Sequence, residues 1–184
     1  MNAGGAVVSA GATKGAWVRW TVAACLGAGL ILSPPWAGGA RAAEASWQGH
    51  IVATVVRFEA LPVGDAKGHS VGLFENRGAI VHDDGRVGQI VTRGTFEFVQ
   101  GVATYRGYAV LDYEDGSRAF AEVQGTYDAT GATPIDRGTF TFTGGEGGLR
   151  GLGGEGTFSG RALAPVDDGG TLYYTWSVTA TLPD

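Results

Sequence analysis

Turn-forming residues recur at short, even intervals after Ala43, and this spacing limits the possible fold more than any other feature. Sequences such as Asp83-Asp84-Gly85 and Glu114-Asp115-Gly116 are typical of hairpin turns, because Gly readily adopts positive φ. The segments between the turns are rich in Val, Thr and Phe and show no helical period. They predict eight strands, at residues 47–58, 70–81, 87–99, 102–113, 117–128, 137–143, 155–163 and 171–182. Short strands at this spacing indicate a sandwich or a barrel.

The last of these segments divides most clearly into two faces. Apolar residues at every second position from Leu172 to Leu182, including Tyr174 and Trp176, alternate with Thr, Ser and Tyr. Successive side chains of a strand point to opposite faces, so the pattern predicts one buried and one wetter face.

Segment 47–58 is apolar on both faces. Strict alternation puts Ile51 and Val55 on one face and Val52, Val56 and Phe58 on the other. This pattern indicates either a central strand or a barrel strand whose outer wall meets another subunit, and the first interpretation is the simpler one.

A repeat within the chain indicates how the sheet is closed. The sequence from Arg93 to Gly101 (RGTFEFVQG) is echoed from Arg137 to Gly145 (RGTFTFTGG). Two copies are too few for a solenoid, but they fit the internal pseudo-symmetry of a closed sheet. Closure also removes exposed strand edges. We therefore predict an all-β domain at residues 43–184, a single closed antiparallel eight-stranded barrel.

Glycines cluster between residues 144 and 156. A phosphate-binding loop would have to open a helix, but this cluster leads into Thr157-Phe158-Ser159, which is typical of a strand. The cluster instead predicts bulges or sharp bends at a corner of the barrel.

The residues from Gly138 to Phe158 (GTFTFTGGEGGLRGLGGEGTF) resemble a signature of the allene oxide cyclase and dirigent barrel superfamily, and those from Arg106 to Gly116 resemble its bacterial members. The resemblance covers roughly residues 90–162. It implies an eight-stranded antiparallel barrel with a central cavity, and a homo-oligomer, because the plant members often form trimers. Some members cyclise fatty-acid epoxides, some steer radical coupling of phenols, and related bacterial barrels cyclise polyketides. No catalytic set aligns residue by residue, so the resemblance carries no specific activity.

The N-terminal residues 1–42 have the features of a secretory signal peptide. They contain no Asp or Glu, basic residues precede an apolar run from Trp20 to Leu32, and Ala40-Arg41-Ala42 fits a cleavage site. The run is shorter than the roughly 20 residues of a spanning helix. An uncleaved anchor and a lipoprotein signal at Cys25 are the alternatives. The prediction is a secreted or periplasmic protein without a stable membrane anchor after cleavage.

Cleavage at this site would leave an acidic chain without cysteine. Lys14, Arg19, Arg41 and Cys25 would be lost, whereas all 18 acidic residues would remain. Such a domain has neither a disulfide nor a thiolate nucleophile. Its charge argues against nucleic acid and anionic membranes as partners. No cofactor motif is present, and we predict no cofactor.

Ionisable residues within the predicted strands are the best indication of a site. If their face is the lumen (the interior of the barrel), they form a polar cluster that orients a ligand or transfers a proton; if it is the outer wall, they are solvated charges, as most strand charges are. The interior would then be filled or lined by aromatic residues of the predicted strands, among them Phe96 and Trp176. The candidate ligand-binding residues are Glu75, Arg77, Arg106, Asp112, Glu122, Tyr174 and Trp176.

The histidines give weaker indications. His82-Asp83-Asp84 could suggest a metal site, but its spacing matches no established ligand pattern, and a hairpin turn explains it equally well. We predict no metal. His50 could point into the core.

Three functions remain open. The first is a barrel that binds a small hydrophobic or aromatic molecule in its lumen. The second is a cyclase or isomerase that holds a reactive substrate in one folded conformation. The third is a structural module of the cell envelope with a filled interior. A cavity lined by apolar residues plus Arg106 or Glu122 favours the first two, whereas an interior packed solid by the Phe residues favours the third. A paired carboxylate deep in the pocket with a strongly perturbed pKa would favour chemistry over binding alone.

Overall fold

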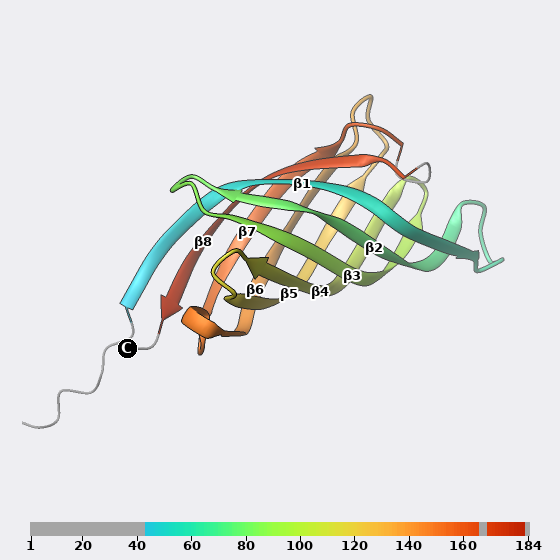
Figure 1. Cartoon of the computed structure of the whole chain (residues 1–184). Helices are drawn as coiled ribbons and strands as arrows, with labels where there is room; N and C mark the ends of the chain where they lie inside the picture. The colour runs from blue at the N-terminus through green and yellow to red at the C-terminus, as the bar shows by residue number, and fades with distance from the viewer. Residues whose placement is uncertain (1–42, 166–168, 183–184) are drawn as a thin grey trace, which may run out of the picture. The chain divides into compact units, whose positions relative to one another are not determined.

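The computed structural model describes residues 43–165 and 169–182, which form a closed antiparallel barrel (Figure 1). Each strand pairs with the next in sequence, and β8 pairs with β1. The predicted fold class is therefore confirmed, whereas the predicted signal peptide at residues 1–42 lies outside the described residues. The strands are β1 (Ala43–Pro62), β2 (His69–His82), β3 (Val87–Val99), β4 (Val102–Tyr113), β5 (Arg118–Asp128), β6 (Ile135–Glu146), β7 (Gly153–Ala162) and β8 (Thr171–Leu182).

Strand β1 is the longest because its two neighbours pair with overlapping but staggered parts of it. Its first part pairs with β8, from Ala43 opposite Leu182 to Thr54 opposite Thr171. Its later part pairs with β2, as far as Pro62 opposite Ser70. This stagger between neighbouring strands is what closing a sheet into a barrel requires. It extends β1 beyond the predicted segment 47–58 at both ends.

A β-bulge in β1 changes which residues face the lumen. The register between β1 and β2 shifts between Val55 and Arg57, so the alternation of faces is reset at this point. Phe58 consequently faces the lumen, against the prediction that it shares a face with Val52 and Val56. Val52 and Val56 lie on the outer wall, 49% and 53% exposed.

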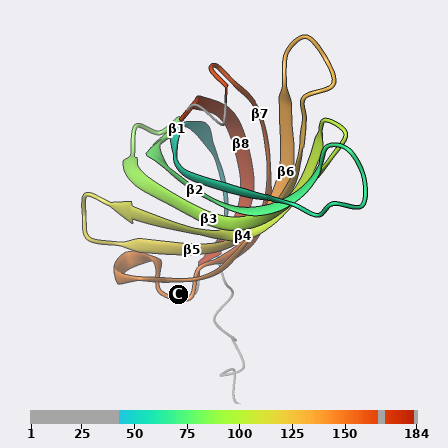
Figure 2. The same ribbon diagram turned by 90° about the vertical axis from the view of Figure 1, so that its right-hand side faces the viewer.

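One end of the barrel is filled with apolar side chains. The short 3-10 helix η1 (Gly147–Leu149) joins β6 to β7 there (Figure 2). Leu149 and Leu152 are buried in a cluster that includes Phe142 and Trp176. The glycine cluster therefore forms a corner, as predicted, and Gly147 and Gly151 have φ of 64° and 77° there. We call this the closed end.

His82 is buried at the closed end. Its Nε2 lies 3.0 Å from the Tyr113 hydroxyl, and its Nδ1 lies 3.3 Å from a guanidinium nitrogen of Arg86. An arginine can only donate, so Nδ1 accepts and the imidazole is neutral. The guanidinium also lies 4.6 Å from the ring centre of Trp47. His82, which was weighed as a metal ligand, is thus a structural residue that begins the predicted hairpin.

Aromatic rings of the lumen lie directly opposite glycines on the neighbouring strand. In each pair, a Cβ atom added to the glycine would overlap the ring, so the ring occupies the space that the glycine leaves free. The ring covers the glycine with apolar surface. The pairs are Gly72–Phe96, Gly94–Phe74, Gly125–Tyr105, Gly138–Phe158, Gly156–Phe140 and Gly160–Tyr174.

Candidate ligand-binding site

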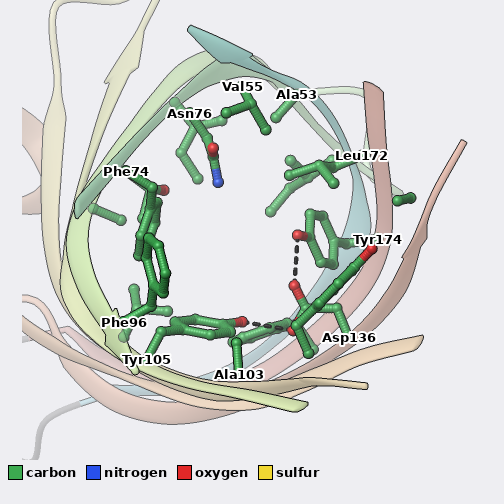
Figure 3. A pocket seen from close by; sticks show the side chains of 18 of the residues that line it. Ala53, Val55, Phe74, Asn76, Phe96, Ala103, Tyr105, Asp136, Leu172 and Tyr174 are labelled. Carbon is green, nitrogen blue, oxygen red and sulfur yellow. Dashed lines mark hydrogen bonds between the residues drawn. The ribbon is translucent and has the colours of Figure 1, made fainter. Parts of the chain in front are cut away.

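The barrel encloses a cavity of about 780 Å³ (Figure 3). Side chains from all eight strands line it, together with the β5–β6 and β7–β8 connections at Pro134 and Leu163. These connections lie at the end opposite η1, which we call the mouth. The cavity stops at Ile80, Leu111 and Trp176, where the core of the closed end begins. The lumen is therefore a cup with one filled end.

Most of the lining is aliphatic or aromatic. The side chains around the middle of the cup include Phe74, Phe96 and Leu172 (Figure 3). A mainly apolar wall with a few polar groups is typical of sites for small organic molecules. The lining residues with polar side-chain atoms are Ser70, Asn76, Thr92, Tyr105, Tyr127, Asp136, Tyr174 and Trp176.

The polar groups of the lining centre on Asp136. The Tyr105 hydroxyl donates a hydrogen bond of 2.7 Å to Oδ1 of Asp136, and the Tyr174 hydroxyl donates one of 2.8 Å to Oδ2 (Figure 3). These residues come from β4, β6 and β8, which are alternate strands of the barrel. The two tyrosine hydroxyl groups and the Asp136 carboxyl group therefore meet on the inner face of the wall.

Burial dominates the electrostatics of this cluster. Only 5% of Asp136 is exposed, and desolvation raises the pKa of its carboxyl group, although hydrogen bonds from Tyr105, Tyr174 and the backbone of Arg137 oppose the rise. Desolvation and the nearby carboxylate raise the pKa values of both tyrosines far above the usual range. Both tyrosines therefore stay protonated and act as donors.

Two further polar atoms of the lining are buried without a hydrogen-bond partner among the described residues. They are Oδ1 of Asn76 and Nε1 of Trp176. Buried polar atoms are normally paired, so each of these is a place where a bound molecule or water could complete a hydrogen bond.

The structure separates the seven predicted ligand-binding residues into two groups. Tyr174 and Trp176 line the cavity. The five charged residues do not, because each alternates along its strand with lumen-facing neighbours and points to the outer wall. Those charged residues are Glu75, Arg77, Arg106, Asp112 and Glu122.

Several of these outer charges pair with one another across strands. Glu75 accepts hydrogen bonds from Arg77 at 2.6 Å and Arg93 at 2.9 Å, and Arg118 donates to Asp112 at 2.6 Å. The alternative of solvated charges on the outer wall therefore describes them, and a ligand-orienting cluster inside the barrel does not.

Sequence reasoning missed Asp136 and Tyr105. The predicted strand began at residue 137, one position after the carboxylate, whereas β6 begins at Ile135. The available signal was the alternation of side chains along a strand. Asp136 lies an even number of positions from Phe140 and Phe142 and so shares their face, as Tyr105 does with Ala103. Extending the strand by one residue would have placed a carboxylate in the lumen.

The other two histidines lie outside the cavity. His50 is on the outer wall, against the prediction that it could face the core, and its Nδ1 lies 2.9 Å from the Tyr173 hydroxyl. His69, near the mouth, lies 2.7 Å from Asp65 and 3.0 Å from Glu97. Within residues 43–165 and 169–182, no group of three or more His, Cys, Asp or Glu residues could hold a metal ion. The same residues contain no helix that is long and apolar enough to cross a membrane.

In the described residues, fold and site together define an antiparallel β-barrel with an apolar cavity that is closed at one end. Similar solved structures are two pterocarpan synthase dirigent proteins. GePTS1 is 13% identical, over 83% of this chain and 98% of that one, with a TM-score of 0.46. PsPTS1 is 11% identical, over 77% of this chain and 97% of that one, with a TM-score of 0.42. No protein-family model and no curated protein match the chain. The eight-stranded antiparallel barrel implied by the dirigent-like sequence features is confirmed by the structure.

Proposed function

We propose that this protein binds a small hydrophobic molecule in the lumen of its barrel. The observation that carries the proposal is the cavity of about 780 Å³, which lies within the range of about 300–1,000 Å³ for small-molecule sites. A barrel of eight strands can be filled by its own side chains, but here the side chains of the lining leave this volume open. A structural module with a filled interior fits this cavity poorly.

The shape of the cavity supports containment of the ligand. The apolar core at Leu149 and Leu152 blocks one end, so a bound molecule is withdrawn from water on all sides except the mouth. Removing apolar surface from water contributes roughly 25 cal/mol per Å², so an apolar molecule gains most by entering deeply.

A pair of variants on one strand tests this proposal. Ala103 lines the cavity, whereas its neighbour Thr104 is exposed on the outer wall. We expect Ala103→Trp to fill part of the lumen and to weaken binding of the neutral fluorescent probe N-phenyl-1-naphthylamine by about tenfold or more. Thr104→Trp should leave the affinity unchanged. The measurement is a fluorescence titration of both variants, after their melting temperatures have been compared. Equal affinity in the two variants would contradict binding in the lumen.

The environment of Asp136 favours a second candidate function. Burial raises the pKa of the Asp136 carboxyl group, and two phenol hydroxyls hold it in one orientation, which are features of a carboxyl group that transfers protons. A cyclase or isomerase would use the apolar wall to fold its substrate and Asp136 to transfer the proton. Its test is Asp136→Asn: an enzyme would keep its affinity for a co-purified ligand and lose the turnover of that ligand, whereas a binding protein has no turnover to lose.

We also propose that the protein is exported, on the basis of the predicted signal sequence, and that its natural ligand travels with it. Native mass spectrometry of protein purified from its own host would give the mass of the processed chain, its oligomeric state and any retained small molecule. A mature N-terminus near Ala43 and an added small mass are the expected results. A full-length chain would contradict export by cleavage.

A further inference from the structure

The lining of the cup carries an unbalanced charge. Asp136 is the only acidic residue among the described lining residues, and no Lys, Arg or His is among them. No ion pair joins Asp136 to any basic residue of the described chain; the neighbouring Arg137 side chain is exposed and lies on the other face of β6. A buried carboxylate without a cationic partner is costly.

The groups around Asp136 are arranged to support an anion rather than to neutralise it. Tyr105 and Tyr174 each donate to a different carboxylate oxygen, and the backbone at Arg137 adds a further hydrogen bond. Each carboxylate oxygen has a second lone pair, so the group can still accept a hydrogen bond from a ligand. The site therefore offers an oriented acceptor with no positive charge of its own.

Aromatic rings surround this acceptor. Phe74 packs edge-on against Tyr105 at a centroid distance of 5.6 Å, and Phe158 packs edge-on against Tyr174 at 5.7 Å. All four rings line the cavity. Aromatic faces attract organic cations, most strongly where water is excluded. A carboxylate within an aromatic wall is thus complementary to an ammonium group on an apolar body.

We propose that the lumen selects hydrophobic amines, with the ammonium group of the ligand paired to Asp136 and its apolar body against the aromatic wall. This inference rests on the proposed function, because it names the class of ligand that the cavity takes. The same ion pair forms whether the proton is initially on the amine or on Asp136. An ammonium ion meets the carboxylate directly, and a neutral amine takes the proton from the carboxylic acid, so both routes give the same ion pair.

A neutral phenol or alcohol is the main competing ligand. Its hydroxyl could hydrogen-bond to the same carboxyl group, but an alcohol carries no charge and forms no ion pair with Asp136. A fatty acid would place a second acidic group beside Asp136, with no cation between the two. The cavity is therefore expected to rank amines first, neutral alcohols second and carboxylic acids last.

Matched probes test this ranking on the intact protein. At pH 7.5, 1-naphthylmethylamine and 1-naphthylmethanol, which have the same ring system, are titrated as competitors of bound N-phenyl-1-naphthylamine. We expect the amine to bind at least tenfold more tightly than the alcohol. Asp136→Asn, which keeps the size of the side chain, should bring the two affinities together, whereas Asp112→Asn on the outer wall should leave the preference intact.

Each result separates this inference from the proposed function. If the alcohol binds the natural chain as tightly as the amine, amine selection is overturned and the lumen remains a site for neutral molecules. If the amine preference survives in a folded Asp136→Asn variant, Asp136 is not its source, and the inference also fails. If none of the naphthyl compounds binds, the proposed function itself is wrong. The comparison of amine with alcohol in the natural chain decides the question even if Asp136→Asn does not fold.

Discussion

Tyr174 on β8 donates a hydrogen bond of 2.8 Å to Asp136 on β6, although β7 lies between these two strands. Tyr105 makes the corresponding bond from β4, on the other side of β5. The Asp136 cluster therefore connects strands that share no backbone ladder. It stabilises the wall of the cup and at the same time presents a polar group to the cavity.

Removing one of these bonds should destabilise the barrel measurably. We expect Tyr174→Phe to lower the free energy of unfolding by about 2 kcal/mol, because a buried hydrogen bond to a charged group contributes about 1.5–3 kcal/mol. Tyr173→Phe is the matched control, since the Tyr173 hydroxyl bonds to His50 on the outer wall and should matter little. Urea denaturation of both variants measures the difference, and equal losses would contradict a special role for the Asp136 cluster.

His82 should make the barrel less stable in mild acid. Burial, followed by the charge of Arg86, lowers its pKa from 6.5 to about 4, so between these values the unfolded chain binds a proton that the folded chain does not. Stability contributed by neutral His82 is therefore present above pH 6.5 and is lost as the pH falls toward 4. Between pH 7 and pH 5 the natural chain should lose about 2 kcal/mol more than His82→Gln.

Urea denaturation of the natural chain and His82→Gln at both pH values tests this prediction. The exposed His50 provides the control: His50→Gln should show the same loss on acidification as the natural chain. If His82→Gln also does so, His82 is not protected from protonation in the fold.

The ion pairs of Glu75 on the outer wall should also make the barrel less stable as the pH falls. Hydrogen bonds from Arg93 and then Arg77 lower the pKa of this carboxyl group below its usual value of 4.5. Its contribution to stability is thus present above pH 4.5 and is lost as the pH falls through the lowered folded-state pKa. We expect Glu75→Gln to be less stable than the natural chain at pH 7, and the difference to be smaller at pH 3.

Thermal unfolding at the two pH values measures this convergence. Glu122→Gln is the control, because Glu122 forms no ion pair within the described part of the chain, and it should leave the melting temperature unchanged at both values. A constant gap between Glu75→Gln and the natural chain would argue against an electrostatic origin.

The glycine–aromatic pairs predict a sharp difference between two glycines. A Cβ at Gly138 would overlap the ring of Phe158 and the carbonyl oxygen of Gln124, whereas a Cβ at Gly131 would find no atom nearer than 3.9 Å. Gly138→Ala should therefore destabilise the fold by about 2 kcal/mol, the usual effect of overpacking, and Gly131→Ala should be neutral. Denaturant unfolding tests both, and a neutral Gly138→Ala would show that Phe158 moves aside freely.

Local patterns predicted most of the sheet. The bounds of β3, β4 and β8 agree with the predicted segments, because alternation and turn residues mark both of their ends. The ends of β1 and β6 were missed, since they are held by partners distant in sequence and not by local signals. The β-bulge after Val55 was equally invisible, and it moved Phe58 into the lumen.

The candidate site was harder to predict than the fold. Alternation assigns every second residue of a strand to the same face. Which of the two faces is the lumen follows only when the neighbouring strands are placed. Tyr174 and Trp176 were identified because their whole strand has an apolar face. The charged residues chosen as candidates lie on the outer wall, whereas Asp136, the carboxylate of the described lining, lay one position before the predicted strand 137–143.

The apolar core around η1 also determines how the cup exchanges its contents. With Leu149, Leu152 and Trp176 occupying the far end, a molecule must leave by the opening through which it entered. A second molecule therefore cannot push the first one out from behind, and release depends on the first one departing by itself. If the lumen binds a ligand as proposed, the cup would hold and release one molecule at a time through a single opening.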